Sequence, residues 1–347
     1  MKNTNTLIYS LYCGGLYGTE KMALATLVHL PENYQKILFC PKGVAAEKAK
    51  QLGIETHTFT NKLDYCNTAL KTILKHKNII IISSSISHSI ILTLLSFITF
   101  KKTKNFHIVH GGADEYNSYQ SKKTLNYLPI TLIAVSDYVG SKLVEYGNAK
   151  EKIKVVENFL PETPSNDYQQ LRRNWPPKNI LLVARVDPIK RIDLLINLLI
   201  KHPKLNKFNF TVVGSGTELT KLQSESIENN LNIKWTGYQS DVRSYYDQAD
   251  LFLHLCPNEP FGLVILEAMT NSLPVIAPDT GGPSQILSHH KTGFLYKSTD
   301  IDSLAHILHQ TEKLTHLEIN NITDEAHLDI KTKYNPVNGI KRYISLF

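Results

Sequence analysis

The sequence has 347 residues, 42% of them hydrophobic and 20% charged, and its four cysteines are scattered and form no C-x-x-C pair. This length favours two domains of ordinary size, and the composition is that of a globular protein. The cysteine spacing argues against a disulfide framework or a paired-cysteine zinc site, and isolated thiols suit a reducing cytoplasm.

The net charge of +7 lies in the first half of the chain, where residues 1–165 hold 19 lysines, no arginine and 12 acidic residues. Lysine blocks at residues 71–77 and 101–104 indicate either a face drawn to an anionic membrane or anionic acceptor, or a solvated surface. Without arginine or interleaved aromatic residues in this half, we do not expect nucleic acid as a partner.

Residues 79–100 carry no formal charge and are long enough to cross a bilayer. Serines and threonines interrupt the segment, and residues 79–82 form an isoleucine run typical of a buried strand. We therefore expect a strand, a serine-rich turn and a helix in place of a membrane span. The amino terminus lacks a signal-peptide pattern, so we expect a cytoplasmic protein, with peripheral contact at the inner face of the membrane as an extension.

Short apolar runs alternate with helical patterns along the first half, which predicts a parallel sheet covered on both faces. The predicted strands are residues 7–9, 36–39, 79–82, 106–109 and 132–135, and the predicted helices include 20–30 and 44–52.

A turn-rich stretch at residues 161–166 indicates a linker, after which the alternation restarts. Predicted strands follow at 179–183, 208–213, 233–235, 251–254 and 274–277, and predicted helices at 193–199, 218–229, 242–248 and 263–270. We expect an α/β fold with two Rossmann-like domains, residues 1–165 and 166–330, and a C-terminal helix in 331–347 that packs back toward the first. Ligands bind beyond the carboxyl ends of such strands, which predicts an interdomain cleft.

Glu259 and Glu267 lie eight residues apart after the predicted strand 251–254, one before a helix and one about a turn inside it. Phe261, Gly262 and Leu263 should form the helix entrance, where free N–H groups favour anions or hydroxyl oxygens. Gly262 permits close backbone approach. Glu267, on the inner face of this helix, suits the paired hydroxyls of a ribose.

This region resembles the retaining glycosyltransferases of family 4 (glycosyl transferases group 1), which have the GT-B fold. The E-x7-E motif is followed by residues 267–269, 274–276, 281–282 and 291–295 in the family's order. The resemblance extends from about residue 7 to 295 and is dense only in the second domain.

Arg185 and Lys190 resemble the family's R-x4-K segment after the first strand of the second domain. A departing diphosphate builds negative charge, which a guanidinium and an ammonium can stabilise without a metal. In the same domain Gly214 belongs to a segment that resembles the family's G-x-G turn. Gly237 and Tyr238 resemble the family's segment whose backbone lies near the nucleotide base, although an exposed loop aromatic is an equal alternative for Tyr238.

In the first domain, residues 13–20 resemble the family's glycine-rich loop, and Gly14 and Gly15 are the glycines we expect near the diphosphate. His110, at the end of the strand 106–109, matches the family histidine that faces the donor sugar. Arg191 departs from the family pattern, which often has glycine there, and adds a cation near the phosphate loop.

The only D-x-D sequence, residues 300–302, can bind a metal in other glycosyltransferases, but it precedes a predicted helix. We therefore expect Asp300 to cap that helix, and we expect no metal or other cofactor.

The resemblance implies catalysis by Glu259, His110, Arg185 and Lys190. The donor would be a nucleotide-sugar, UDP-linked in our expectation, and a hexose or N-acetylhexosamine would pass to a glycan or lipid-linked acceptor. Such a transfer would be a step in the synthesis of a bacterial cell-surface polysaccharide or lipopolysaccharide. Two alternatives remain open: a UDP-sugar 2-epimerase on the same fold, and a non-catalytic nucleotide-sugar-binding protein.

Overall fold

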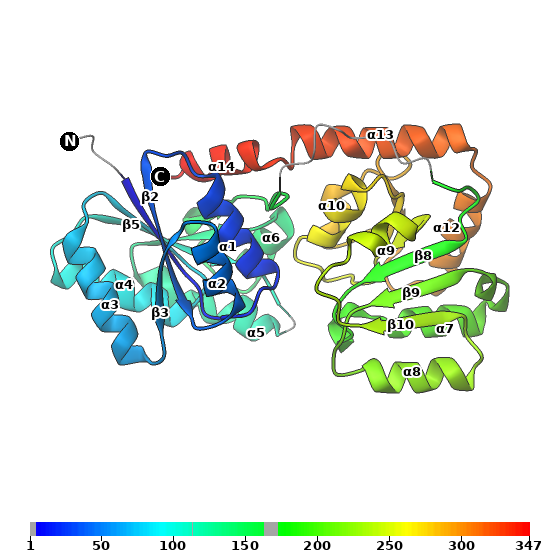
Figure 1. Ribbon diagram of the computed structural model, residues 1–347, viewed down its shortest axis with the longest axis horizontal. Helices are drawn as coiled ribbons and strands as arrows, with labels where there is room; N and C mark the ends of the chain where they lie inside the picture. Colours follow the sequence, from blue (N-terminus) through cyan, green and yellow to red (C-terminus); the bar gives the residue numbers. More distant parts are fainter. Residues whose placement is uncertain (1–4, 113, 163–172) are drawn as a thin grey trace. The chain divides into compact units, whose positions relative to one another are not determined.

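The computed structural model describes residues 5–112, 114–162 and 173–347, and the chain divides into two compact units (Figure 1). The first unit contains residues 1–163 and 335–347, and the second contains residues 164–334. This division falls close to the expected boundary at residues 165 and 166. The segment that returns to the first unit begins at Asn335 rather than at residue 331.

The described residues of the first unit form a seven-stranded parallel sheet. In spatial order its strands are β3 (Glu55–Phe59), β2 (Tyr34–Pro41), β1 (Asn5–Ser10), β4 (Ile79–Ser83), β5 (Thr103–Val109), β6 (Ile130–Ala134) and β7 (Ile153–Val155). The direction of strand addition reverses between β1 and β4, which makes this the switch point of a doubly wound sheet.

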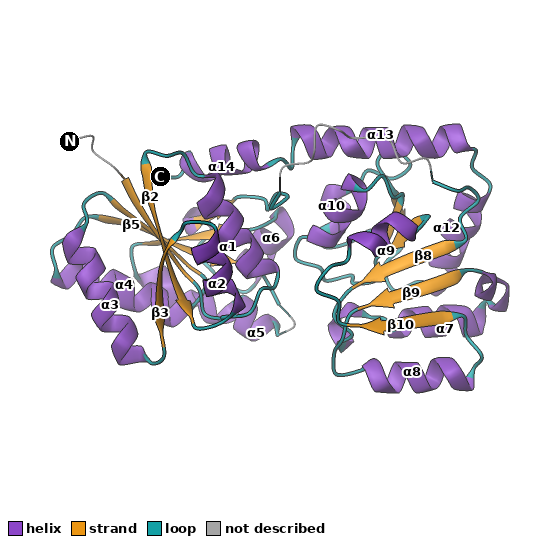
Figure 2. Cartoon of the chain, viewed as in Figure 1, coloured by secondary structure: helices purple, strands orange, loops and turns teal. Residues whose placement is uncertain are grey.

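Helices connect these strands and cover the sheet (Figure 2). They are α1 (Gly18–His29), α2 (Val44–Gln51), α3 (Lys62–Lys75), α4 (Ile86–Ile98), α5 (Glu115–Ser118), α6 (Asp137–Glu145) and α14 (Pro336–Ile344), with 3-10 helices at Gln120–Tyr127 and Lys150–Lys152. Helix α1 packs with α2 and α14, whereas α3 packs with α4. Right-handed crossovers on either side of a switch point place helices on opposite faces in this way.

The second unit repeats the arrangement with a six-stranded parallel sheet in its described residues. The strand order is β10 (Ile233–Gly237), β9 (Asn209–Val213), β8 (Asn179–Val183), β11 (Leu251–Leu253), β12 (Val275–Pro278) and β13 (Phe294–Tyr296). Its switch point lies between β8 and β11. Both halves are thus Rossmann-like, as the alternating pattern predicts.

The helices of the second unit are α7 (Asp193–Lys201), α8 (Leu219–Glu228), α9 (Arg243–Gln248), α10 (Leu263–Thr270), α11 (Pro283–Ile286), α12 (Ile301–Glu312) and α13 (His316–Thr332), with 3-10 helices at Pro188–Lys190 and Pro203–Lys207. Helix α7 packs with α8 and α12, and α10 packs with α11 and α13. The predicted cap of α12 is confirmed, because the Asp300 carboxylate accepts hydrogen bonds from the backbone N–H groups of Asp302 and Ser303.

The uncharged segment 79–100 folds as the strand β4, a short turn and the helix α4, as predicted. All of β4 is buried, because a parallel strand at the centre of a doubly wound sheet is covered on both faces. Across the described residues, no helix combines the length and apolar character needed to span a bilayer.

The end of the chain completes the first unit. In α14, Ile340 and Tyr343 are buried, and Gly339 lies where a Cβ atom would approach the Phe159 ring. Phe347 contacts the rings of Tyr34 and Phe106. Residues 335–347 are therefore part of the core of this unit and not a loose tail.

Candidate active site

The predicted site residues of the second unit lie on loops that leave the carboxyl ends of its parallel strands. Residues 184–192 follow β8, and residues 254–262 follow β11, the neighbouring strand across the switch point. Loops diverge at a switch point and leave a depression beyond the strands, where ligands of such sheets bind. Here the two loops carry charged side chains, among them Arg185, Lys190 and Glu259.

Lys190 and Glu259 meet at this switch point, with the Lys190 Nζ 2.6 Å from the Glu259 Oε2. Both side chains are largely buried. Burial by itself would raise the pKa of Glu259, but Lys190, His254 and Arg185 together outweigh it, and the net pKa is lowered. Burial likewise opposes the charge of Lys190, and the Glu259 carboxylate more than restores it, so the Lys190 pKa is raised. The two groups are a buried ionised pair.

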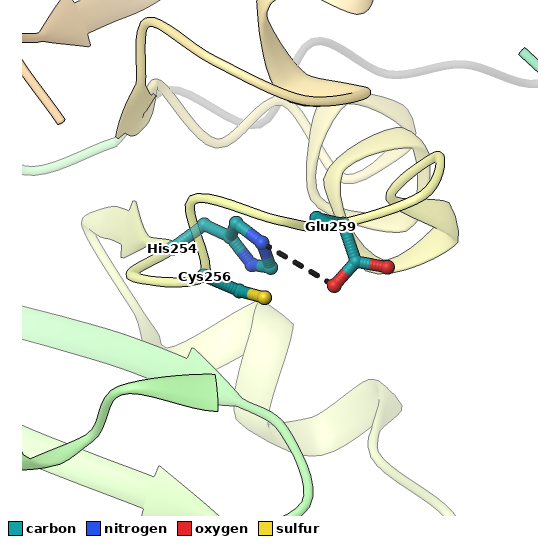
Figure 3. Close-up of side chains that lie close together, drawn as sticks. All are labelled: His254, Cys256 and Glu259. Carbon is teal, nitrogen blue, oxygen red and sulfur yellow. Dashed lines mark ion pairs between the residues drawn. The ribbon is translucent and has the colours of Figure 1, made fainter. Parts of the chain in front are cut away.

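His254 and Cys256 lie beside Glu259 on the same loop (Figure 3). The His254 Nε2 is 3.5 Å from the Glu259 Oε2, and burial lowers the pKa of His254 to about 4. The imidazole is therefore neutral at pH 7, and this contact is polar but not an ion pair. Burial raises the pKa of Cys256 to about 12, and its thiol donates to the Ile189 carbonyl over 3.1 Å.

The ligand atoms of His254, Cys256 and Glu259 all lie within 4.8 Å of one another, a grouping of N, S and O donors that could in principle hold Zn²⁺. Lys190 already occupies the Glu259 carboxylate, and the thiol is held in its protonated form. A cation would have to displace an ammonium and a proton, so this arrangement suits a neutralised carboxylate better than a metal centre.

Arg185 stands at the start of the β8 loop with its guanidinium exposed. Its Nη1 lies 2.6 Å from the Asp187 Oδ2, and Asp187 also accepts a hydrogen bond from the backbone N–H of Thr217. Asp187 therefore ties the β8 loop to the loop after β9 and orients Arg185. The R-x4-K motif names only the two cations and does not identify the Asp187 carboxylate.

Arg191 adopts the left-handed conformation with φ 54°, which explains why glycine is favoured at this position. Its side chain pairs with Asp193 at 3.1 Å in the first turn of α7. The extra cation expected near the phosphate loop is thus partly neutralised by a local carboxylate.

The predicted helix entrance at residues 261–263 is present, with Gly262 as the N-cap of α10 at φ 112°. The Phe261 side chain is buried and packs edge-on against Tyr334. Leu263 is the first residue of the helix. The backbone of this turn, and not the Phe261 ring, is what it can offer to a ligand.

Two further glycines hold the loop that carries Glu259. The Gly282 N–H donates to the Glu259 carbonyl over 2.7 Å, and a Cβ atom on Gly282 would come within 2.4 Å of the Phe261 backbone. Gly281, at φ 69°, would collide with the carbonyls of Pro257 and Glu259. This close packing fixes the height of Glu259 above the sheet.

Glu267 lies one turn inside α10, as expected, and its Oε2 accepts a hydrogen bond from the Tyr246 hydroxyl over 3.0 Å. Tyr246 is buried at the end of α9, and burial raises its pKa well above the usual value. Tyr246 is therefore a neutral donor that orients Glu267. It precedes Glu267 by 21 residues and belongs to another helix, so no local motif reveals it.

Gly214 has an intramolecular reason to be glycine. At φ 145° its Cβ atom would lie 1.8 Å from the Ala184 carbonyl, on the loop after β8. Tyr238 follows the edge strand β10 and is exposed. Three strand spacings separate β10 from β11, roughly 14 Å at about 4.8 Å per strand. Tyr238 therefore follows a strand that is adjacent neither to β8 nor to β11, the strands whose loops carry the Lys190–Glu259 pair.

In the first unit, Gly14 and Gly15 lie in the loop after β1, at that sheet's switch point. A Cβ atom on Gly14 would lie 2.6 Å from the Lys42 carbonyl, so Gly14 allows this loop to pack against the turn after β2. At Gly15 the nearest atoms belong to the movable Tyr17 ring. Of the two, Gly15 leaves more freedom for a ligand.

His110 follows β5 at the carboxyl edge of the first sheet. Burial lowers its pKa to about 4, and its Nε2 has no hydrogen-bond partner among the described residues. A neutral imidazole with an unsatisfied nitrogen can donate to or accept from a sugar hydroxyl. This geometry agrees with the expected role without testing it.

Comparisons with known proteins find similarity to sugar-transferring enzymes. The family model described as "Glycosyl transferases group 1" matches residues 165–325. A GDP-mannose-dependent alpha-mannosyltransferase of Mycobacterium tuberculosis is 31% identical over 46% of this chain, and the match spans 42% of that protein. The O-antigen biosynthesis glycosyltransferase WbnH of Escherichia coli is 28% identical over 67% of this chain and 68% of its own length.

Among solved structures, the Anabaena protein HepE, crystallised with UDP and glucose, superposes with a TM-score of 0.79. It is 19% identical and covers 97% of this chain and 98% of its own. The fold and the loops at the switch points define the class: a GT-B protein with two Rossmann-like domains. Residues 165–325 match the glycosyl transferases group 1 family model, in agreement with the predicted family and enzyme class.

Proposed function

We propose that the chain is a retaining glycosyltransferase that moves a hexose or N-acetylhexosamine from a UDP-linked donor to a glycan or lipid-linked acceptor. Its place is in the synthesis of a bacterial cell-surface polysaccharide or lipopolysaccharide. The observation that carries this proposal is the buried Lys190–Glu259 pair at the switch point of the second sheet, beside the exposed guanidinium of Arg185.

When the bond between the sugar and the diphosphate of the donor breaks, the diphosphate departs and negative charge grows on the oxygen that had bridged them. Lys190 and Arg185 are the cations that the β8 loop presents at the carboxyl edge of the sheet. An ammonium has three N–H donors, so Lys190 can hold Glu259 and still donate to a phosphate oxygen. Because Lys190 is largely desolvated, its charge acts more strongly than it would in water.

In this proposal the acidic groups hold the neutral parts of the donor. Lys190 pairs with the Oε2 atom of Glu259, and the other oxygen of that carboxylate can accept a hydrogen bond from a sugar hydroxyl. Glu267, oriented by Tyr246, accepts the ribose hydroxyls. The backbone N–H groups at the start of α10 complete the cradle, and His110 contacts the sugar.

We propose retention of the anomeric configuration because the chain resembles the retaining glycosyltransferases of family 4. A double displacement needs a carboxylate nucleophile close to the anomeric carbon. Glu259 is neutralised by Lys190, and a front-face displacement assisted by the leaving phosphate requires no protein nucleophile. No resident metal enters this mechanism.

The names of the similar proteins support a nucleotide-sugar as the donor but differ in the nucleobase, uracil or guanine. HepE was crystallised with UDP and glucose, and the mycobacterial relative is named for GDP-mannose. The O-antigen name of WbnH supports a surface glycan as the acceptor. The lysine-rich first half of the chain supports an anionic, membrane-proximal acceptor.

The test is a mass-spectrometric screen of the purified chain with UDP-, GDP- and ADP-sugars, comparing wild type with Lys190→Ala and Glu259→Ala. Slow donor hydrolysis by wild type that both variants lose supports the proposal. The control is Lys207→Ala, which breaks an ion pair with Glu312 on the same unit, away from the switch point. Full turnover in both site variants would overturn the assignment.

The same screen separates the two alternatives. An epimerase would convert the donor into a sugar isomer without an acceptor, and a non-catalytic protein would bind a nucleotide-sugar without changing it. The anomeric configuration of the transferred sugar, read by NMR, tests retention.

A further inference from the structure

The carboxyl-terminal ends of α3 and α4 expose a group of large apolar side chains to solvent. Phe100 is 96% exposed, Ile98 70% and Phe97 57%, and Leu74 is exposed at the end of α3. Single exposed apolar residues are ordinary on protein surfaces. Four of them at the ends of two adjacent helices are not, and such surfaces mark contact with a partner or a membrane.

These residues belong to one surface, because the ends of the two helices are tied together. The Lys101 ammonium donates to the carbonyls of Leu74 over 3.1 Å and of His76 over 3.0 Å. The following strands are neighbours in register, with Ile79 beside Thr103. Helices α3 and α4 lie side by side on the first unit (Figure 1). We call Leu74, Phe97, Ile98 and Phe100 the α3–α4 patch.

The backbone conformation at Phe100 is strained. It follows the C-cap of α4 at φ 52°, a left-handed position that usually holds glycine or asparagine. A bulky aromatic side chain there gains almost no burial within the chain to offset that strain. Its ring is therefore explained better by something outside the chain than by the stability of the fold.

The charges around the patch are of one sign. Residues 65–113 contain six lysines and no aspartate or glutamate. Lys75, Lys77 and Lys102 are exposed next to the patch, and Lys104 contacts the carbonyl of Phe347. Glu55 interacts electrostatically with Lys75, and its carboxylate is hydrogen-bonded to Gln35 and His57.

We propose that the α3–α4 patch and its lysines dock the protein on an anionic lipid surface. Aromatic and aliphatic side chains entering the interface, flanked by lysines that reach the headgroups, are the combination that binds such membranes. A protein partner is disfavoured, because lysine is depleted from protein–protein interfaces. The surface deepens the membrane-proximal role in the proposed function, but lipid binding does not depend on that function.

Docking through this patch orients the first unit. The patch precedes β4 and β5, at the amino edge of the sheet, whereas His110 follows β5 at the carboxyl edge. Strand β5 has seven residues, so the two edges lie roughly 20 Å apart at about 3.3 Å per residue. The candidate site of this unit is therefore held away from the lipid.

The test is co-sedimentation of the full chain with vesicles of equal parts phosphatidylglycerol and phosphatidylcholine, and with phosphatidylcholine alone. We expect wild type to pellet with the anionic vesicles, less so at high salt and least with phosphatidylcholine. Phe100→Gly should weaken binding about tenfold, the value of one buried aromatic side chain, while thermal stability stays equal or rises. Lys102→Glu should weaken binding about fivefold or more.

The matched control is Ile227→Ser, which removes an equally exposed apolar side chain from α8 of the second unit and should bind as wild type does. Wild type that stays in the supernatant, or Phe100→Gly that pellets equally well, overturns the proposal. A wild-type dimer in sedimentation velocity that Phe100→Gly dissociates would assign the patch to a second copy. Donor hydrolysis without vesicles, measured in parallel, should be unchanged in Phe100→Gly. A chain that binds lipid and hydrolyses no donor contradicts only the proposed enzymatic function.

Discussion

The two units have the same strand order around their switch points but use opposite chemistry there. In the second unit the loops after β8 and β11 meet through an ionised pair, Lys190 and Glu259. In the first unit a buried network of uncharged groups lies at the end of β1: the Ser10 hydroxyl contacts the Tyr65 hydroxyl at 2.9 Å and the His88 Nδ1 at 3.0 Å. Burial lowers the pKa of His88 to about 4, so this network is neutral at pH 7.

In the proposed function this difference fits two kinds of ligand. A site that receives a diphosphate needs fixed positive charge and pays for its burial with a paired carboxylate. A site that receives sugar hydroxyls needs oriented donors and acceptors without net charge.

The largest effect should come from breaking the charged pair. Lys190→Ala removes a cation from the proposed leaving group and should lower kcat about 100-fold or more. It also leaves Glu259 buried without its partner, which should cost about 3 kcal/mol of unfolding free energy. Steady-state kinetics and urea unfolding measure the two effects.

A Lys190→Met/Glu259→Gln double variant separates stability from catalysis. Replacing both charges removes the unpaired carboxylate, so stability should recover while activity stays low. Recovery of activity together with stability would mean that the pair is only structural.

The neutral network of the first unit should be sensitive to acid. A histidine whose folded pKa is depressed binds fewer protons folded than unfolded between about pH 4 and 6.5. The unfolding free energy should therefore fall as the pH is lowered through this window, by roughly 3 kcal/mol for His88 if its shift is fully expressed. His88→Phe should flatten the slope in urea unfolding at several pH values, and the exposed His306→Phe should not. An unchanged slope in His88→Phe would contradict a buried neutral imidazole.

Tyr246→Phe tests whether the Tyr246 hydroxyl orients the Glu267 carboxylate for nucleotide binding. Loss of the hydrogen bond to Glu267 should weaken nucleotide binding about tenfold, the value of about 1.4 kcal/mol for a hydrogen bond to a charged group. Calorimetry with UDP measures this, and Tyr245→Phe, at the neighbouring position, is the control. Equal UDP affinity in Tyr246→Phe would show that Glu267 does not hold the ribose.

Arg191→Gly should have the smallest effect. Glycine relieves the left-handed strain at φ 54°, but the change also removes the contact with Asp193. These effects oppose each other, so we expect a change of less than about 1 kcal/mol in unfolding free energy. A large loss of UDP affinity instead would show that Arg191 contacts the phosphates.

Much of the fold is readable from the sequence, because central parallel strands are continuous apolar runs and give a strong local signal. β4 and β8 are examples. Strand β3 lies at the sheet edge, alternates threonine with other residues and is only partly buried, so its signal is weak. The sequence signal of helix α3 is weak for a similar reason, since lysine, asparagine and threonine dilute its apolar face.

The site was predictable to the level of loops, because strand ends at a switch point locate it. The contacts that orient its side chains were not. Tyr246 and Gly282 act on residues that lie on other loops or helices, and Asp187 joins Arg185 to Thr217 on the loop after β9. These roles depend on distances that no spacing encodes. The motif supplied Glu259 and Lys190, but only the structure pairs them.

The return of the chain to the first unit has a consequence for biosynthesis. Residues 164–334 are continuous and can complete their core as soon as they leave the ribosome, whereas the first unit lacks α14 until residues 335–347 emerge. The unit translated first is thus the one that finishes last, with the surface around Phe159 uncovered during the interval. A nascent chain arrested before Asn335 should be protease-sensitive in its amino-terminal half and resistant in its carboxyl-terminal half.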